Sequence, residues 1–255
     1  MTVDVRIGTE SVHRGPIAGL VGQLAVLGVL AAEVGLHSAG WLAGIIYAVV
    51  TWAALTSALE RSGVRALGPA NAVTLGRATL VGGVAALVAD SLVHRPAPVA
   101  VLVAVATVAL ILDGVDGRVA RMTGTSSPMG ARFDGEIDAF LILVLSAFVA
   151  ESMGIWVLAI GAFRYAFVAA SWVLPWLRTS LPRRISRSSI AAVQGIVLVV
   201  ASAGLVPMAI MMAVVAASLA LLTWSFVRDV RWLWLQRVPV VAERSAARVA
   251  KQLVH

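Results

Sequence analysis

The chain has 255 residues, of which 60% are hydrophobic and 13% are charged, with a net charge of +7 at pH 7 and a mean hydropathy of +0.94. This composition excludes an ordinary soluble domain and predicts an all-α, polytopic membrane protein. The absence of cysteine excludes disulfides, thiolate metal sites and a cysteine nucleophile.

The positive charge comes from arginines that bracket apolar stretches. This placement favours a role in membrane topology and in contact with anionic lipid headgroups over nucleic-acid binding. The four histidines stand at the ends of apolar runs that are far apart in the sequence. Their separation argues against a histidine-based metal site.

A helix that crosses a bilayer needs roughly 20 apolar residues. In chain order, the sequence offers eight apolar windows of about this length, separated by clusters of Gly, Pro, Arg or Ser. The windows are Ile17–Leu36, Trp41–Leu59, Ala72–Leu92, Ala97–Asp113, Phe133–Val149, Ile155–Leu174, Ser189–Leu205 and Met208–Phe226. We therefore predict eight transmembrane helices, the first of which is retained and not cleaved as a signal peptide.

The arginines also predict the orientation of these helices. One set of connections, which includes both ends of the chain, holds nearly all of them, whereas the opposite set holds only Arg95. Because cytoplasmic loops are enriched in Lys and Arg, we expect a multi-pass protein of the cell (inner) membrane with both termini in the cytoplasm. The same rule places the acidic stretch between residues 113 and 138 at the cytoplasmic face.

Breaks in composition divide the chain into three parts. We predict that residues 1–60 form a two-helix N-terminal transmembrane extension and that residues 61–227 form a six-helix core. Residues 228–255 alternate arginine with Trp, Leu and Val, as either an amphipathic helix on the membrane surface or a solvated chain end would.

One stretch near the middle carries five of the thirteen acidic residues, although charge is costly close to hydrocarbon. Asp113 and Asp116 are three residues apart and Asp134 and Asp138 are four apart, so each pair lies on one face of a helix. The Gly- and Pro-containing segment 124–128 predicts a turn between the two helices. We therefore expect four carboxylates to converge at one end of a helix pair.

Four carboxylates in one cleft repel one another unless a cation neutralises them. Oxygen ligands without His or Cys suit Mg²⁺ or Mn²⁺, and four carboxylates suit two such ions. Nearby, Arg118, Arg121 and Arg132 offer donors for phosphate oxygens. Divalent metals and arginines are the groups that proteins use for transfer at phosphorus.

The residues of this stretch follow the pattern Asp113-x-x-Asp116-Gly117-x-x-Ala120-Arg121, eight further residues, and Gly130-x-x-x-Asp134-x-x-x-Asp138. The pattern resembles the signature of the CDP-alcohol phosphotransferase family at every fixed position. Upstream, the segment with Asn71, Thr74 and Arg77 is similar to the looser pattern that opens the family's first core helix. The resemblance covers about residues 69–226 and leaves out the first two helices.

This resemblance implies roles for individual residues. Two Mg²⁺ or Mn²⁺ ions bridging the diphosphate of a CDP-linked substrate would be held by Asp113, Asp116, Asp134 and Asp138. Asp138 would also be the catalytic general base, taking the proton of an acceptor hydroxyl that attacks the β-phosphorus while CMP leaves. The cytidine diphosphate would be contacted by Gly117, Ala120, Arg121, Gly130 and Thr74. Family members are also commonly homodimers.

Arg164 is the most informative residue outside the signature. It lies ten residues after Gly154, which places it near mid-membrane at about 1.5 Å per residue, where an unpaired arginine is expensive. We expect it to face the same cavity and to meet a carboxylate or an anionic acceptor; a structural pair with an acid elsewhere is the alternative. Glu136 points to another helix face than its neighbouring aspartates, so we interpret it as solvated or paired with an arginine.

The segment 178–187 holds Arg183, Arg184 and Arg187 together with Arg178. Such a run is typical of a positive-inside loop, but relatives with phosphorylated acceptors bind the acceptor phosphate near this place. The segment lacks the lysine-rich form typical of the glycerophosphate enzymes, and so departs from their pattern.

The sequence thus favours an integral-membrane enzyme of phospholipid biosynthesis that moves a phosphatidyl group from CDP-diacylglycerol to a hydroxyl acceptor and releases CMP. Within the family, the alternative is a small CDP-linked alcohol as donor and diacylglycerol as acceptor. From another class, buried aspartates also fit an ion- or proton-coupled transporter. An inactive, scaffolding member of the family is a further alternative.

Overall fold

The computed structural model describes residues 10–62, 69–94, 96–123, 128–178 and 185–252, and these ranges contain helices and no strands. The helices are α1 (Glu10–Val34), α2 (Ser38–Ser62), α3 (Pro69–Val93), α4 (Val99–Thr123), α5 (Pro128–Met153), the short η2 (Ile155–Val157), α6 (Leu158–Val173), the short η3 (Pro175–Arg178), α7 (Ile185–Ala203) and α8 (Met208–Gln252). The prediction of an all-α fold is confirmed.

Five candidate membrane spans lie within the described ranges, in α1, α2, α3, η2–α6 and α8. Shorter apolar segments, Val99–Val115 and Ser189–Ala203, lie in α4 and α7. The first half of α5 carries Asp134, Glu136 and Asp138, so its apolar part is shorter than the helix. The structure therefore has the character of a polytopic helical membrane protein, as predicted, and the membrane sidedness of its ends stays a prediction.

The α3 helix lies at the centre of the bundle. It packs against α1, α2, α4 and α5. Its residues Val81, Val84 and Leu87 are at most 1% exposed, because neighbouring helices cover every face of this segment. The N-terminal α1 and α2 thus pack directly on the helix that carries Thr74 and Arg77.

A glycine and a close helix contact place α6 beside α5. Gly154 follows the last residue of α5 with a φ of 103°, a left-handed conformation that side chains other than glycine rarely adopt. On α6, a Cβ added at Gly161 would lie 2.4 Å from the Cα of Leu143 on α5. The missing side chain lets the two helices approach closely one turn before Arg164.

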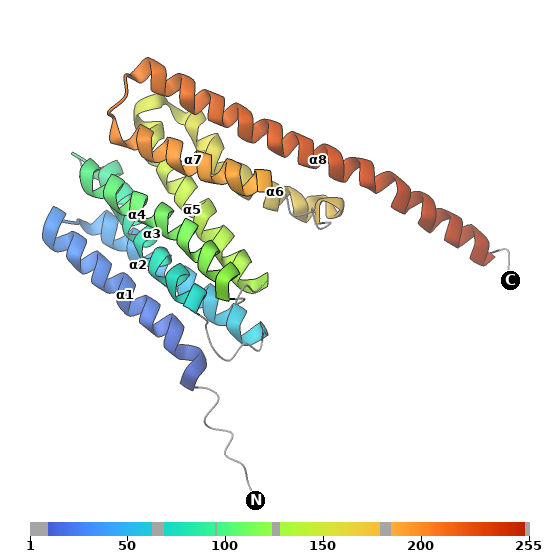
Figure 1. Cartoon of the computed structure of the whole chain (residues 1–255), viewed down its shortest axis with the longest axis horizontal. Helices are drawn as coiled ribbons and strands as arrows, with labels where there is room; N and C mark the ends of the chain where they lie inside the picture. The colour runs from blue at the N-terminus through green and yellow to red at the C-terminus, as the bar shows by residue number, and fades with distance from the viewer. Residues whose placement is uncertain (1–9, 63–68, 95, 124–127, 179–184, 253–255) are drawn as a thin grey trace, which may run out of the picture.

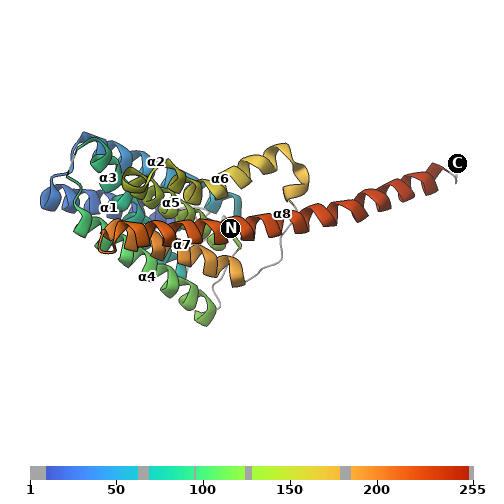
Figure 2. The same ribbon diagram turned by 90° about the horizontal axis from the view of Figure 1, so that it is seen from above.

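The last helix is longer than the span predicted for it. The sequence predicts a span that ends at Phe226, but α8 continues as one helix to Gln252 and extends beyond the other helices (Figures 1 and 2). Residues 228–252 are therefore helical, which the amphipathic interpretation of the tail requires. The division into extension, core and tail stays a prediction.

Candidate active site

A buried arginine connects three helices at one end of the bundle. Arg77 on α3 is 0% exposed, and its Nη1 donates to Oδ1 of Asp113 on α4 at 2.6 Å. The same nitrogen pairs with Asp138 on α5, and Nη2 pairs with Asp134, also on α5. The guanidinium fork is rigid and always charged, so it can hold several carboxylates in a fixed arrangement.

The three carboxylates lie close enough to share an ion. One oxygen each from Asp113, Asp134 and Asp138 lies within 4.8 Å of the others. Their side chains remain 28–32% exposed, so the cluster is open to a ligand. Three ionised carboxylates against one guanidinium leave an excess of negative charge, and an oxygen-only donor set of this kind fits Mg²⁺ or Mn²⁺.

For most of the other predicted site residues near the cluster, the side chains are not among those that the structure describes. The backbone of α4 includes Asp116, Gly117, Ala120 and Arg121, but their side chains are not among those described, and the same holds for Arg187 on α7. Arg183 and Arg184 lie wholly outside the described ranges.

Two of the predicted nucleotide contacts can be placed. Thr74 is buried on α3, one turn before Arg77, and Gly130 is half-buried on α5, one turn before Asp134. Thr74 therefore lies on the helix that carries Arg77, and Gly130 lies on the helix that carries Asp134 and Asp138. Their predicted role toward the cytidine diphosphate stays a prediction.

Arg164 pairs with Glu136. Its Nη2 lies 2.5 Å from Oε1 of Glu136 on α5, and the two side chains are 41% and 55% exposed. Of the two states expected for Glu136, solvated or paired with an arginine, the structure shows the pair with an arginine. Arg164 also lines the cavity of which Asp138 forms part of the wall. It therefore both pairs with a carboxylate and faces this cavity.

A cavity of about 440 Å³ lies between α5, α6, α7 and α8, and Asp138 forms part of its wall. Its wall includes three aromatic rings, those of Phe163, Phe167 and Phe226. The ring centroid of Phe226 lies 5.1 Å from that of Phe163 and 5.8 Å from that of Phe167. The polar groups in its wall include Arg164, Gln194 and Asp229. A mostly apolar cavity with a few polar groups is the usual form of a small-molecule site.

Two of these polar groups were not predicted from the sequence. Gln194 on α7 is 1% exposed and donates through Nε2 to the Ser218 carbonyl at 2.8 Å, whereas its buried Oε1 has no hydrogen-bond partner within the described part of the chain. Asp229 on α8 is 7% exposed. An acidic residue directly after a long apolar run was the available sequence signal for Asp229, but no sequence pattern distinguishes Gln194.

A comparison with protein families gives one match. The family model for CDP-alcohol phosphatidyltransferase matches residues 67–235, about two thirds of the chain. The chain belongs to the CDP-alcohol phosphatidyltransferase family. No curated protein and no solved structure matches it.

Membership confirms the resemblance drawn from the signature and implies an enzyme that transfers a phosphatidyl group from a CDP-alcohol to a hydroxyl acceptor with release of CMP. The family uses a divalent metal ion, and the carboxylates around Arg77 are acidic groups able to bind one. The match begins just before α3, so α1 and α2 lie outside it.

Proposed function

We propose that this chain transfers a phosphatidyl group from CDP-diacylglycerol to a hydroxyl acceptor, releasing CMP, as a step of phospholipid biosynthesis. The observation that carries the proposal is the position of Asp138. Its carboxylate belongs to the cluster around Arg77 and also lines the cavity between α5 and α8. A base in this position would meet a diphosphate on one side and an acceptor on the other.

In this proposal, Asp138 accepts the proton of the acceptor hydroxyl. The acceptor oxygen forms a bond to the β-phosphorus of the donor, and the bond from that phosphorus to the oxygen shared with the α-phosphate breaks. CMP leaves with that oxygen, so the proton and the negative charge are both accounted for. The ion pair with Arg77 holds the Asp138 carboxylate between the cluster and the cavity, where a base would be needed.

The metal-binding residues are proposed to be Asp113, Asp116, Asp134 and Asp138, holding two Mg²⁺ or Mn²⁺ ions. When bound, these ions neutralise charge on the diphosphate and on the leaving phosphate. The surplus of carboxylate over guanidinium charge near Arg77 supports this assignment. Arg77 would keep the carboxylates of α4 and α5 together both with and without bound metal ions.

The acceptor is proposed to enter the cavity beside Asp138. The cavity volume of about 440 Å³ suits a small alcohol or the head of a larger lipid. Arg164 at its edge can pair with an anionic acceptor, and we extend this role to Arg183, Arg184 and Arg187 if the acceptor carries a phosphate. For the nucleotide, we propose Gly117, Ala120, Arg121, Gly130 and Thr74.

We further propose that the protein lies in the cell (inner) membrane with its active site and both termini at the cytoplasmic face, as a homodimer. The distribution of arginines supports this orientation. Reporter fusions at the N-terminus, the C-terminus and residues 94–97 test it, and a cytoplasmic reporter at 94–97 would contradict it. Crosslinking in intact membranes tests the dimer.

The decisive experiment incubates purified protein with CDP-diacylglycerol, Mg²⁺ or Mn²⁺ and a panel of free and phosphorylated alcohols. We expect CMP and a new phospholipid in equal amounts with at least one acceptor. A parallel reaction with small CDP-alcohols and diacylglycerol tests the reverse assignment of donor and acceptor. Ion flux into liposomes without CMP release from any pair would overturn the proposal.

A further inference from the structure

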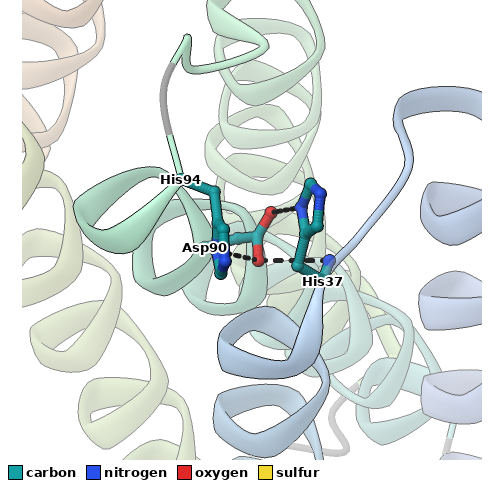
Figure 3. A group of neighbouring side chains, drawn as sticks. All are labelled: His37, Asp90 and His94. Carbon is teal, nitrogen blue, oxygen red and sulfur yellow. Dashed lines mark hydrogen bonds and ion pairs between the residues drawn. The ribbon is translucent and has the colours of Figure 1, made fainter.

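Two histidines and an aspartate meet at the other end of α3 from the carboxylate cluster. Asp90 lies thirteen residues after Arg77, or about 20 Å along the helix. Figure 3 shows His37 facing it from the connection between α1 and α2, with His94 just after α3. The histidines are far apart in the sequence, which argued against a histidine-based metal site, but His37 and His94 lie close together because α2 and α3 pack side by side.

Asp90 is held in place by the start of α2. Its Oδ1 accepts hydrogen bonds from the backbone N–H groups of His37, at 3.1 Å, and of Gly40, at 3.3 Å. The first N–H groups of a helix have no partner within the helix, so this carboxylate caps α2 from the neighbouring helix. A Cβ at Gly40 would lie 2.9 Å from the carbonyl oxygen of Ala86, which shows how closely the two helices approach there.

The two imidazoles face the same carboxylate. His37 Nδ1 lies 3.0 Å from Oδ2 of Asp90, and His94 Nδ1 lies 3.5 Å from Oδ1. That His94 nitrogen is buried, and no hydrogen-bond partner for it exists among the described residues. A buried ring nitrogen that makes no hydrogen bond, and that lies beside a carboxylate and a second imidazole, is able to serve as a metal ligand.

We propose that His37, Asp90 and His94 form a binding site for a transition-metal ion of the Zn²⁺ class. Their ligand atoms lie within 4.8 Å of one another, and two imidazole nitrogens with one carboxylate oxygen are a ligand set that Zn²⁺ takes readily. The site differs in chemistry from the oxygen-only cluster around Arg77, which suits harder ions.

Binding requires one local adjustment. The rings stack with centroids 4.3 Å apart and planes 14° apart, and one ion cannot lie in the plane of two parallel rings. His37 is 58% exposed, so its ring can turn about the Cβ–Cγ bond with little displacement of protein atoms. Asp90, which is only 13% exposed, stays fixed by the cap, and the exposed side leaves a position for water.

The ion would join two parts of the chain that the family match separates. His37 precedes the matched residues 67–235, whereas Asp90 and His94 lie within them. A metal at this site would therefore fasten the N-terminal α1–α2 pair to the core through α3. This inference does not depend on the proposed transferase activity, because the two sites share no residue.

The test measures Zn²⁺ bound to the full chain, purified in detergent with a tag that contains no histidine, in excess Mg²⁺ to occupy oxygen-only sites. We expect one Zn²⁺ per chain, and Co²⁺ in its place should give the visible absorption of a nitrogen-ligated ion. His94→Gln and His37→Gln should each weaken Zn²⁺ binding by more than about 10–100-fold, which is the usual cost of losing a residue that only orients a metal ligand. His255→Gln is the matched control and should bind Zn²⁺ like the wild type.

Asp90→Asn separates a metal ligand from a helix cap, because the amide oxygen can still accept the two backbone N–H groups. We expect this variant to keep the unfolding temperature of the metal-free protein and to lose Zn²⁺ binding. Zn²⁺ should also raise the unfolding temperature of the wild type and leave that of His94→Gln unchanged. No bound Zn²⁺ in the wild type, or equal binding in His94→Gln and His255→Gln, would show that Asp90 only caps α2 and would overturn the proposal.

Discussion

Arg77 and Asp113, on neighbouring helices, form an ion pair of 2.6 Å in which the arginine is buried and the carboxylate is about a third exposed. The pair sets the character of the site. The buried guanidinium of Arg77 binds the carboxylates on their buried side, and their exposed side remains accessible to a ligand. Breaking it therefore alters both stability and the response to metal ions.

Arg77→Ala should lower the free energy of unfolding by about 1–3 kcal/mol, because the loss of a buried pair partner is costly and partial exposure of the carboxylates reduces that cost. Added Mg²⁺ should stabilise this variant more than the wild type, since the ion replaces a missing positive charge. Thermal unfolding in detergent measures both effects. Arg231→Ala, which removes an exposed arginine of α8, is the control; an equal loss in both variants would contradict the prediction.

Asp138→Asn should reduce CMP release by about 10²–10⁴-fold, the usual contribution of a general base. Glu136→Gln is a close control, because it changes a 55% exposed acid two residues away on the same helix. We expect this control to keep its rate within a few-fold of the wild type. Full activity of Asp138→Asn in the CMP assay would exclude Asp138 as the base.

Chelation of divalent ions should abolish CMP release, and Mg²⁺ or Mn²⁺ alone should restore it. The reason is the excess of carboxylate charge around Arg77, which the diphosphate of a donor cannot approach without a cation. Zn²⁺ should not be needed for recovery, because the histidine cluster is separate from this site. Undiminished activity in chelator would contradict a metal-dependent mechanism.

Arg164→Gln should raise the KM for an anionic acceptor if the arginine binds it at the edge of the cavity. Glu136→Gln removes only the arginine's partner, and an exposed pair contributes about 0–1 kcal/mol to stability. Comparison of both variants with the double variant separates the roles. Equal changes in KM from the two single variants, with none added in the double, would assign Arg164 to its pair with Glu136 alone.

Gly161→Ala should destabilise the protein by about 1–3 kcal/mol, because its Cβ would meet the backbone of Leu143 and force α6 away from α5. Gly28→Ala is the matched control, since a Cβ there meets nothing within 4 Å, and alanine is the better helix former by up to about 1 kcal/mol. Unfolding temperatures of the two variants should therefore move in opposite directions.

Local patterns accounted for much of the fold. Apolar runs interrupted by Gly, Pro and Arg predicted helices whose positions correspond to α1–α8, because helix formation depends on nearby residues. The last predicted span ends at Phe226, whereas α8 continues to Gln252, because arginines outside the membrane do not end a helix. The signature between Asp113 and Asp138 identified the family before any distance was known.

The sequence by itself determined the helical membrane fold and the family, and it indicated the acidic residues of the candidate site, because spacing along one helix and a fixed motif are local properties. Only the tertiary structure decided that Arg77 pairs with three aspartates, that Arg164 meets Glu136, and that His37 and His94 share Asp90. These relationships depend on which faces of different helices meet. That choice is made by packing around α3, where the contacting residues are far apart in the chain.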